Sequence, residues 1–292
     1  MTNQHTEAVK FKKVSQSRDI LRRFLKNRPA IGGMVILCLL LIVFIGGCIL
    51  IPEQRCYDIS GTPFQGPSAE HWFGTDHIGR DVFARVIHGS KISMTIGIGS
   101  TVISVVLGSL IGAVCGYFGG RVDNIIMRIF DIIMCIPGML LIIALVAALG
   151  IGVGNLLIAM IVSMVPGTVR FVRSTVLNLT DMEYIQCAKT YGTGNFTIIV
   201  RHVLPNALGP IIILMASNVA AAIMSAASFS FLGFGVQPPT PEWGAMVAES
   251  RQYMRQAPHL TIFPGLAIVV AAMSINLIGD GLRDALDPRL KD

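Results

Sequence analysis

Six long apolar blocks run through the 292-residue sequence and constrain its fold more than any other feature. An α-helix of about twenty residues crosses a hydrocarbon core about 30 Å thick, and each block is at least that long. The blocks occupy residues 31–51, 92–118, 127–149, 155–174, 207–230 and 260–280. The composition, 53% hydrophobic and 14% charged, agrees with an integral membrane protein. We therefore expect an all-α membrane protein with six transmembrane helices.

The basic residues are divided unevenly between the two sides of these helices. Most of the 23 Lys and Arg residues fall in the N-terminal tail, after the second and fourth blocks, or at the C-terminus. The other connections hold only Arg55, Arg80, Arg85, Lys91, Arg251 and Arg255. The positive-inside rule then predicts a multi-pass protein of the cell membrane with both termini cytoplasmic. Basic residues beside the anionic inner leaflet account for the net charge of +6, so no nucleic-acid partner is expected.

Two longer connections, residues 52–91 and 231–259, then face outward. Within the first, Val82, Phe83, Val86 and Ile87 share one helical face, which predicts a short amphipathic helix over 81–88. Such a helix lies along the membrane surface or packs on the outer ends of the spans. His71, His77 and His88 lack the spacing of a helical metal pair, so we expect surface histidines and no metal site.

Small residues recur at every fourth position of the second block. Ser104, Gly108, Gly112 and Gly116 form a smooth stripe on one face of that helix. In lipid, small residues let two helix backbones approach closely. The stripe predicts either tight packing within the chain or a surface that slides during gating.

The chain has no visible source of energy of its own. Ionisable residues are nearly absent from the centres of the blocks, where an ion-coupled carrier usually needs them. Asp131 and Asp280 lie near predicted cytoplasmic ends, and we expect local pairing with Arg128 and Arg283. Neither a nucleotide-binding phosphate loop nor a catalytic motif occurs in the sequence, so we expect no catalytic residues and no cofactor in this chain. Any solute movement must be passive or driven by another protein.

A polar segment, residues 183–205, interrupts the apolar blocks on the predicted cytoplasmic side. It resembles the EAA loop of permease subunits from binding-protein-dependent ABC importers, with the frame Gln186-Cys187-Ala188, Gly192, His202 and Leu204-Pro205. The spacing agrees throughout, whereas Gln186, Cys187 and His202 differ from the Glu, Ala and Ile of the consensus. Glu183 provides an acidic residue three positions upstream.

Four further stretches resemble the same family, in the same order along the chain. They are residues 71–81, 116–128, 231–244 and 276–288. Together with the EAA-like frame, they are similar to the second permease subunit of dipeptide, oligopeptide and nickel importers.

This resemblance implies a type I ABC importer transmembrane domain over 31–292, after a cytoplasmic tail over 1–30. It also implies a coupling loop at about 175–206 that docks on an ATPase through Glu183, Gln186, Ala188, Lys189, Gly192, Arg201, Leu204 and Pro205. The implied partners are a paired homologous permease, two ATPase subunits that hold ATP and Mg²⁺, an extracytoplasmic solute-binding protein and membrane lipid.

The expected function is therefore that of a permease subunit in an ATP-driven importer for dipeptides or oligopeptides. Nickel or glutathione import by the same family is the alternative. An autonomous channel or secondary carrier is the alternative from a different class, and the lack of intramembrane ionisable groups argues against it. We do not expect the chain itself to be an enzyme.

Overall fold

The structure is a computed structural model that describes residues 21–286, and within this range it is predominantly helical. Residues 1–20 of the predicted tail, and Arg289 and Lys291 at the C-terminus, lie outside the described residues. Five helices are long and apolar enough to cross a membrane. They are α2 (Arg28–Leu50), α3 (Val82–Phe118), α6 (Val153–Thr180), a rod over Asn195–Phe231 that ends in α9 (Leu204–Phe231), and α11 (His259–Leu286).

The expected third span, 127–149, is not one straight helix. The chain forms α4 (Gly120–Met134) and α5 (Gly138–Leu149), and their axes are bent by 85° at the break. Pro137 is the N-cap of α5 in an extended conformation, and its ring cannot continue the hydrogen bonding of α4. If the bent pair counts as one span, the structure has six spans, as the apolar blocks predict.

Ion pairs hold α4 against α6. Arg173 donates to both carboxylate oxygens of Asp123, and Arg170 donates to Asp131 at 2.7 Å. The expected local pair between Asp131 and Arg128 is therefore wrong, because Asp131 lies on the side of α4 that faces α6. One polar side of α4 is anchored to α6, and its apolar side, which includes Ile125, is exposed.

The segment 81–88 is not a separate surface helix. Asp81 is the N-cap of α3, where its carboxylate accepts a hydrogen bond from the backbone N–H of Ala84 at 3.0 Å. The helix then continues without a break to Phe118. Val82, Val86 and Ile87 are buried in a core cluster that also contains Trp243, so this amphipathic pattern belongs to the first turns of a long candidate span.

The predicted stripe of small residues packs α3 on α6. A Cβ atom placed on Gly112 would lie 2.8 Å from the carbonyl oxygen of Val169, and one on Gly116 would lie 2.8 Å from that of Arg173. Gly108 faces Thr168 in the same way, and Ser104 is fully buried. Of the two alternatives for the stripe, the structure supports tight packing within the chain.

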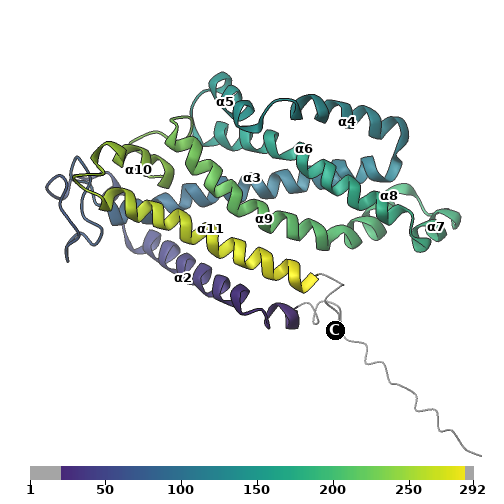
Figure 1. Cartoon of the computed structure of the whole chain (residues 1–292), viewed down its shortest axis with the longest axis horizontal. Helices are drawn as coiled ribbons and strands as arrows, with labels where there is room; N and C mark the ends of the chain where they lie inside the picture. The colour runs from purple at the N-terminus through teal and green to yellow at the C-terminus, as the bar shows by residue number, and fades with distance from the viewer. Residues whose placement is uncertain (1–20, 287–292) are drawn as a thin grey trace, which may run out of the picture.

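The helices form an elongated bundle with two distinct ends (Figure 1). α2 lies along α11, and α9 crosses the middle of the bundle beside α3. α7 (Glu183–Thr190) and α8 (Asn195–Ile198) lie at one end. α10 (Trp243–Ser250) and the connection before α3 lie at the other.

We predict that Gly112→Ala lowers the free energy of unfolding by about 1–3 kcal/mol, the usual cost of overpacking a core. The added methyl group would meet backbone atoms of α6, which cannot rotate away. Thermal unfolding of the detergent-purified chain measures the effect. Gly99→Ala on the same helix is the matched control, because its Cβ would meet only a flexible Leu157 methyl group at 3.4 Å. Equal stability of the two variants would contradict the packing role of the stripe.

Candidate functional site

The 183–205 segment begins with the two-turn helix α7, which follows directly on α6. Ile185 is fully buried and packs in a core cluster with Val176 of α6 and Ile198 of α8. Glu183 lies in the first turn, where a carboxylate interacts favourably with the helix dipole, and its side chain is exposed. One buried apolar side chain therefore anchors an otherwise exposed helix.

Gln186 occupies the position that is Glu in the EAA consensus. Its side-chain N–H donates to the backbone carbonyl of Thr180, the last residue of α6, at 2.8 Å. An ionised Glu carboxylate has no donor and could not make this bond. The departure from the consensus at Gln186 thus adds a contact that fixes the angle between α6 and α7.

Gly192 terminates α7 in a left-handed conformation with φ of 75°. The N–H of Gly192 donates to the carbonyl of Lys189 at 3.0 Å, and that of Thr193 donates to Ala188 at 3.1 Å. This pair of bonds is a Schellman motif, for which glycine is the usual residue. No atom lies within 4 Å of a Cβ built on Gly192, so backbone conformation, rather than space, requires glycine there.

Tyr117, at the end of α3, contacts the same segment on both sides of the Gly192 turn. The Lys189 ammonium lies 5.1 Å from the centre of the Tyr117 ring, and the Tyr117 hydroxyl donates to Asn195 Oδ1 at 2.8 Å. Lys189 therefore has a contact within the chain, in addition to any it makes with a partner. Through Tyr117, the long helix α3 contacts both sides of the Gly192 turn.

The end of the predicted loop is already helical. α8, a π-helical turn at Ile199–Val203 and α9 follow one another without interruption. Leu204 and Pro205 begin α9 directly after the π turn, and Arg201 is exposed on the π turn. The Gly192 turn is therefore joined to the middle of the bundle by continuous helix.

Exposed aromatic residues, which the EAA-like frame did not indicate, surround the Gly192 turn. Tyr191 is 89% exposed and Phe196 80% exposed, and Tyr184 is also solvent-accessible. Tyr191 and Phe196 both flank the Gly192 turn outside the apolar block at 207–230, and large exposed aromatic side chains are typical of protein interaction sites. Their signal in the sequence was aromatic residues in a polar segment, on both sides of a glycine turn.

A cavity of about 800 Å³ opens between α5, α6 and α9. Its walls are mainly apolar, with Met160 and Met164 from α6 and Met224 from α9, and none of its lining residues is charged. Ser163 and Asn218 contribute polar groups from the two long helices. The volume lies in the range of pockets that bind small molecules.

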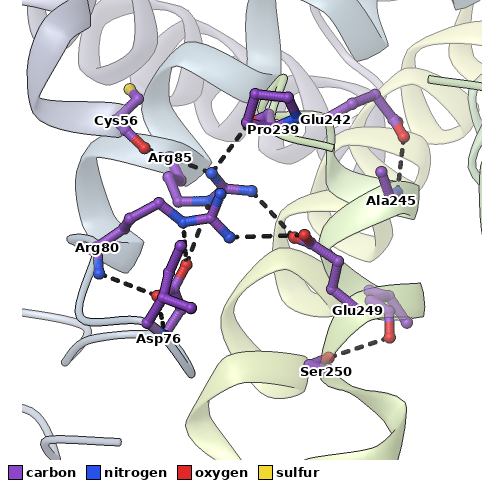
Figure 2. A network of polar contacts seen from close by, with 11 residues as sticks. Cys56, Asp76, Arg80, Arg85, Pro239, Glu242, Ala245, Glu249 and Ser250 are labelled. Atoms are coloured by element: carbon purple, nitrogen blue, oxygen red, sulfur yellow. Dashed lines mark hydrogen bonds and ion pairs between the residues drawn. The ribbon is translucent and has the colours of Figure 1, made fainter. Parts of the chain in front are cut away.

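A buried network of charged residues fastens the opposite end of the bundle (Figure 2). Arg85 donates to Glu249 of α10 at 3.0 Å and to the backbone carbonyl of Pro239 at 3.1 Å. Arg80 pairs with Asp76 and also approaches Glu249 at 3.5 Å. The network therefore joins the connection before α3 to α10 at this end of the bundle.

The histidines near this network are not the surface residues that we expected. His71 is 2% exposed and lies 3.0 Å from Asp81 Oδ2. The His88 ring nitrogen lies 2.9 Å from the carbonyl oxygen of Ile51. Both side chains connect the segment before α3 to the start of that helix, a role that their spacing in the sequence did not indicate.

Family comparisons agree with this architecture. Residues 108–292 match the family described as the binding-protein-dependent transport system inner membrane component. Residues 15–67 match the N-terminal transmembrane domain of oligopeptide transport permease C. The chain therefore belongs to the permeases of binding-protein-dependent ABC importers, in their dipeptide and oligopeptide branch.

Individual relatives cover nearly the whole chain. The dipeptide transport system permease protein DppC of Alkalihalophilus pseudofirmus is 42% identical over 95% of this chain and 91% of its own length. The glutathione transport system permease protein GsiD of Pectobacterium atrosepticum is also 42% identical, over 94% of this chain and 91% of its own. These relatives are transport permeases rather than enzymes.

The fold is that of a type I ABC importer permease. An inward-facing structure of the methionine ABC transporter MetNI superposes with a TM-score of 0.58, at 16% identity, over 70% of this chain and 96% of that one. The likeness confirms the predicted fold class.

We predict that Gly192→Val impairs transport and that Gly192→Asn largely preserves it. Left-handed backbone costs a non-glycine residue about 1–2 kcal/mol, whereas Asn tolerates it better. ATP-driven uptake by the assembled importer in proteoliposomes measures the difference, and membrane insertion should be normal in both variants. Equal activity of the two variants would show that the geometry of this turn is not required.

Proposed function

We propose that this chain is the permease subunit of an ATP-driven importer for dipeptides or oligopeptides, and that its 183–205 segment docks on an ATPase subunit. The observation that carries the proposal is the shape of this segment. A short exposed helix, α7, is anchored by one buried residue, Ile185, and is followed by a turn and a rigid rod. Such a segment transmits a movement of α7 to the long helices of the bundle without changing its own shape.

The exposed residues of the segment fit a protein partner. Tyr191 and Phe196 offer large, stiff apolar surfaces, which often dominate binding energy at interfaces. Arg201 adds a positive charge on the same rod. The chain needs no nucleotide site of its own, because ATP and Mg²⁺ are held by the partner ATPase subunits.

The proposed mechanism follows from the way the helices are connected. Closure of the ATPase dimer moves α7, and the contacts of Gln186 and Tyr117 pass this motion to α6 and α3. Packed helices then shear between inward- and outward-facing arrangements. The cavity between α5, α6 and α9 forms one half of the passage, and a paired homologous permease completes it. A solute-binding protein delivers the peptide on the outer side.

Glutathione is the second candidate substrate, because the GsiD relatives match as closely as the dipeptide permease does. Both substrates are small peptides, and the uncharged walls of the cavity suit either. Nickel import stays an untested prediction. The family assignment favours binding-protein-dependent import over an autonomous channel or carrier.

We predict that Cys187, which is exposed on α7, reacts with a membrane-impermeant maleimide in inverted vesicles but not in intact cells. This result would place α7 on the cytoplasmic side, and with it both termini. The variant used should retain only Cys56 and Cys187. Burial raises the pKa of the Cys56 thiol to about 12, so it stays protonated and unreactive at neutral pH. Labelling of Cys187 in intact cells would reverse the proposed orientation.

We predict that Phe196→Ala weakens capture of the ATPase subunits by about tenfold or more, the effect of removing an interface hot spot. Because the Phe196 side chain is 80% exposed, its removal should leave the fold and the pairing with the second permease intact. Co-purification of the ATPase with the permease pair measures the loss. Trp72→Ala is the matched control, since Trp72 is 63% exposed but lies in the connection before α3, at the opposite end of the bundle.

Two results would count against the proposed function. Uptake of peptide by liposomes that contain this chain alone would show that no ATPase drives it. Normal ATPase capture by a Tyr191→Ala and Phe196→Ala double variant would separate the segment from ATPase docking.

A further inference from the structure

The cavity between α5, α6 and α9 contains polar side chains without partners, and these point to a substrate site. Thr168 and Ser228 donate to carbonyls of their own helices, at 3.2 and 2.8 Å. Ser163, Asn218 and Ser225 also line the cavity, but none of the three makes a hydrogen bond with any described residue. Ser163 and Ser225 come from α6 and α9, and Asn218 lies midway along α9. The three polar side chains that make no hydrogen bond with a described residue therefore line the same cavity.

The Asn218 amide is open to the cavity. Asn218 lies halfway along α9, is half-buried and lines the cavity, so its side chain can reach a bound molecule. A ligand with complementary hydrogen-bonding groups would pair with this amide.

The hydrogen-bonding groups of the amide indicate which kind of ligand would pair with it. The Asn side chain has two N–H donors and a carbonyl acceptor, so it can pair with both the C=O and the N–H of a peptide bond. Hydroxyl groups such as those of Ser163 and Ser225 can donate or accept. With no charged lining residue, the cavity has no group that would select the charge of a substrate side chain.

Methionines make up the adaptable part of the same wall. Met139, Met160, Met164 and Met224 all line the cavity. The flexible, polarizable Met side chain accommodates ligands of different shape and is common at promiscuous binding surfaces. The wall therefore combines fixed groups suited to a peptide backbone with flexible groups suited to varied side chains.

We propose that this cavity is a substrate-binding site for short peptides, in which Asn218 hydrogen-bonds the peptide backbone and the methionines accommodate the side chains. This inference rests on the proposed function and adds the residues that contact the substrate. The site accepts peptides of different sequence because it recognises the peptide backbone, which all of them share.

The first test uses the whole importer in proteoliposomes, with paired permease, ATPase subunits and binding protein. The probe is a radiolabelled tripeptide with a benzophenone side chain, irradiated during ATP-driven uptake. We expect adducts on Met160, Met164 or Met224. Met273 is the internal control, because it is 60% exposed on α11 and does not line the cavity. Adducts confined to Met273 or other residues outside the cavity would overturn the proposal.

The second test removes the amide. We expect Asn218→Leu to reduce adduct formation and tripeptide uptake by about tenfold, the effect of losing one or two buried hydrogen bonds. Ser217→Leu is the matched control, since the neighbouring Ser217 is exposed and donates to Ile213 of its own helix. A tripeptide with methylated backbone nitrogens keeps its carbonyl acceptors but loses its N–H donors, so Asn218→Leu should reduce its uptake less than that of the ordinary tripeptide. If Asn218→Leu transports the ordinary tripeptide normally, the proposal fails.

Two further outcomes separate this inference from the function on which it rests. If Asn218→Leu no longer co-purifies with the paired permease, the amide belongs to a contact between subunits, and the substrate site is refuted while the importer assignment stands. If the unchanged importer takes up no peptide on addition of ATP, the proposed function itself fails. Retained pairing together with selective loss of peptide uptake supports the substrate site.

Discussion

The backbones of α3 and α6 approach each other so closely that Gly112 and Gly116 have no room for a methyl group. Lipid offers no hydrophobic driving force between two apolar helices, so close van der Waals contact must hold them together. The other parts of the bundle are arranged on this pair. α4 is tied to α6 by the Asp123 and Asp131 ion pairs, and α9 packs across α3. The contact between α3 and α6 therefore sets the positions of the elements at both ends of the bundle.

The two ends use different physical means to stay in place. At the α10 end, an ion pair between the buried Arg85 and the partly buried Glu249 holds the connection before α3. Such a pair contributes little net stability, but removal of one partner would leave a costly unpaired charge. At the α7 end, one buried Ile185 and a few hydrogen bonds position a largely exposed helix. The first arrangement resists motion, and the second leaves a surface free for a partner.

Much of the fold could be predicted from the sequence because hydrophobic length and small-residue spacing are local signals. The five unbroken spans and the stripe at Gly108, Gly112 and Gly116 are examples. The 85° bend at Pro137 was not predicted because hydropathy treats the block as one helix, although the proline that ends the hydrogen bonding of α4 is a local feature. The fusion of 81–88 with the second span was missed because it depends on how neighbouring helices bury the segment. The 183–205 frame located the candidate docking segment, but Tyr191 and Phe196 emerged only once exposure was known. The docking role of the residues named from the frame stays a prediction.

By itself, the sequence determined that this protein is an all-helical membrane permease of the binding-protein-dependent ABC importer family. Hydropathy and motif spacing suffice for that, because they act over short stretches of chain. Only the tertiary structure decided which residues of distant segments meet, such as Tyr117 with Lys189 and Ser163 with Asn218 around one cavity. Contacts of this kind depend on helix crossing and depth in the membrane, which no local pattern encodes.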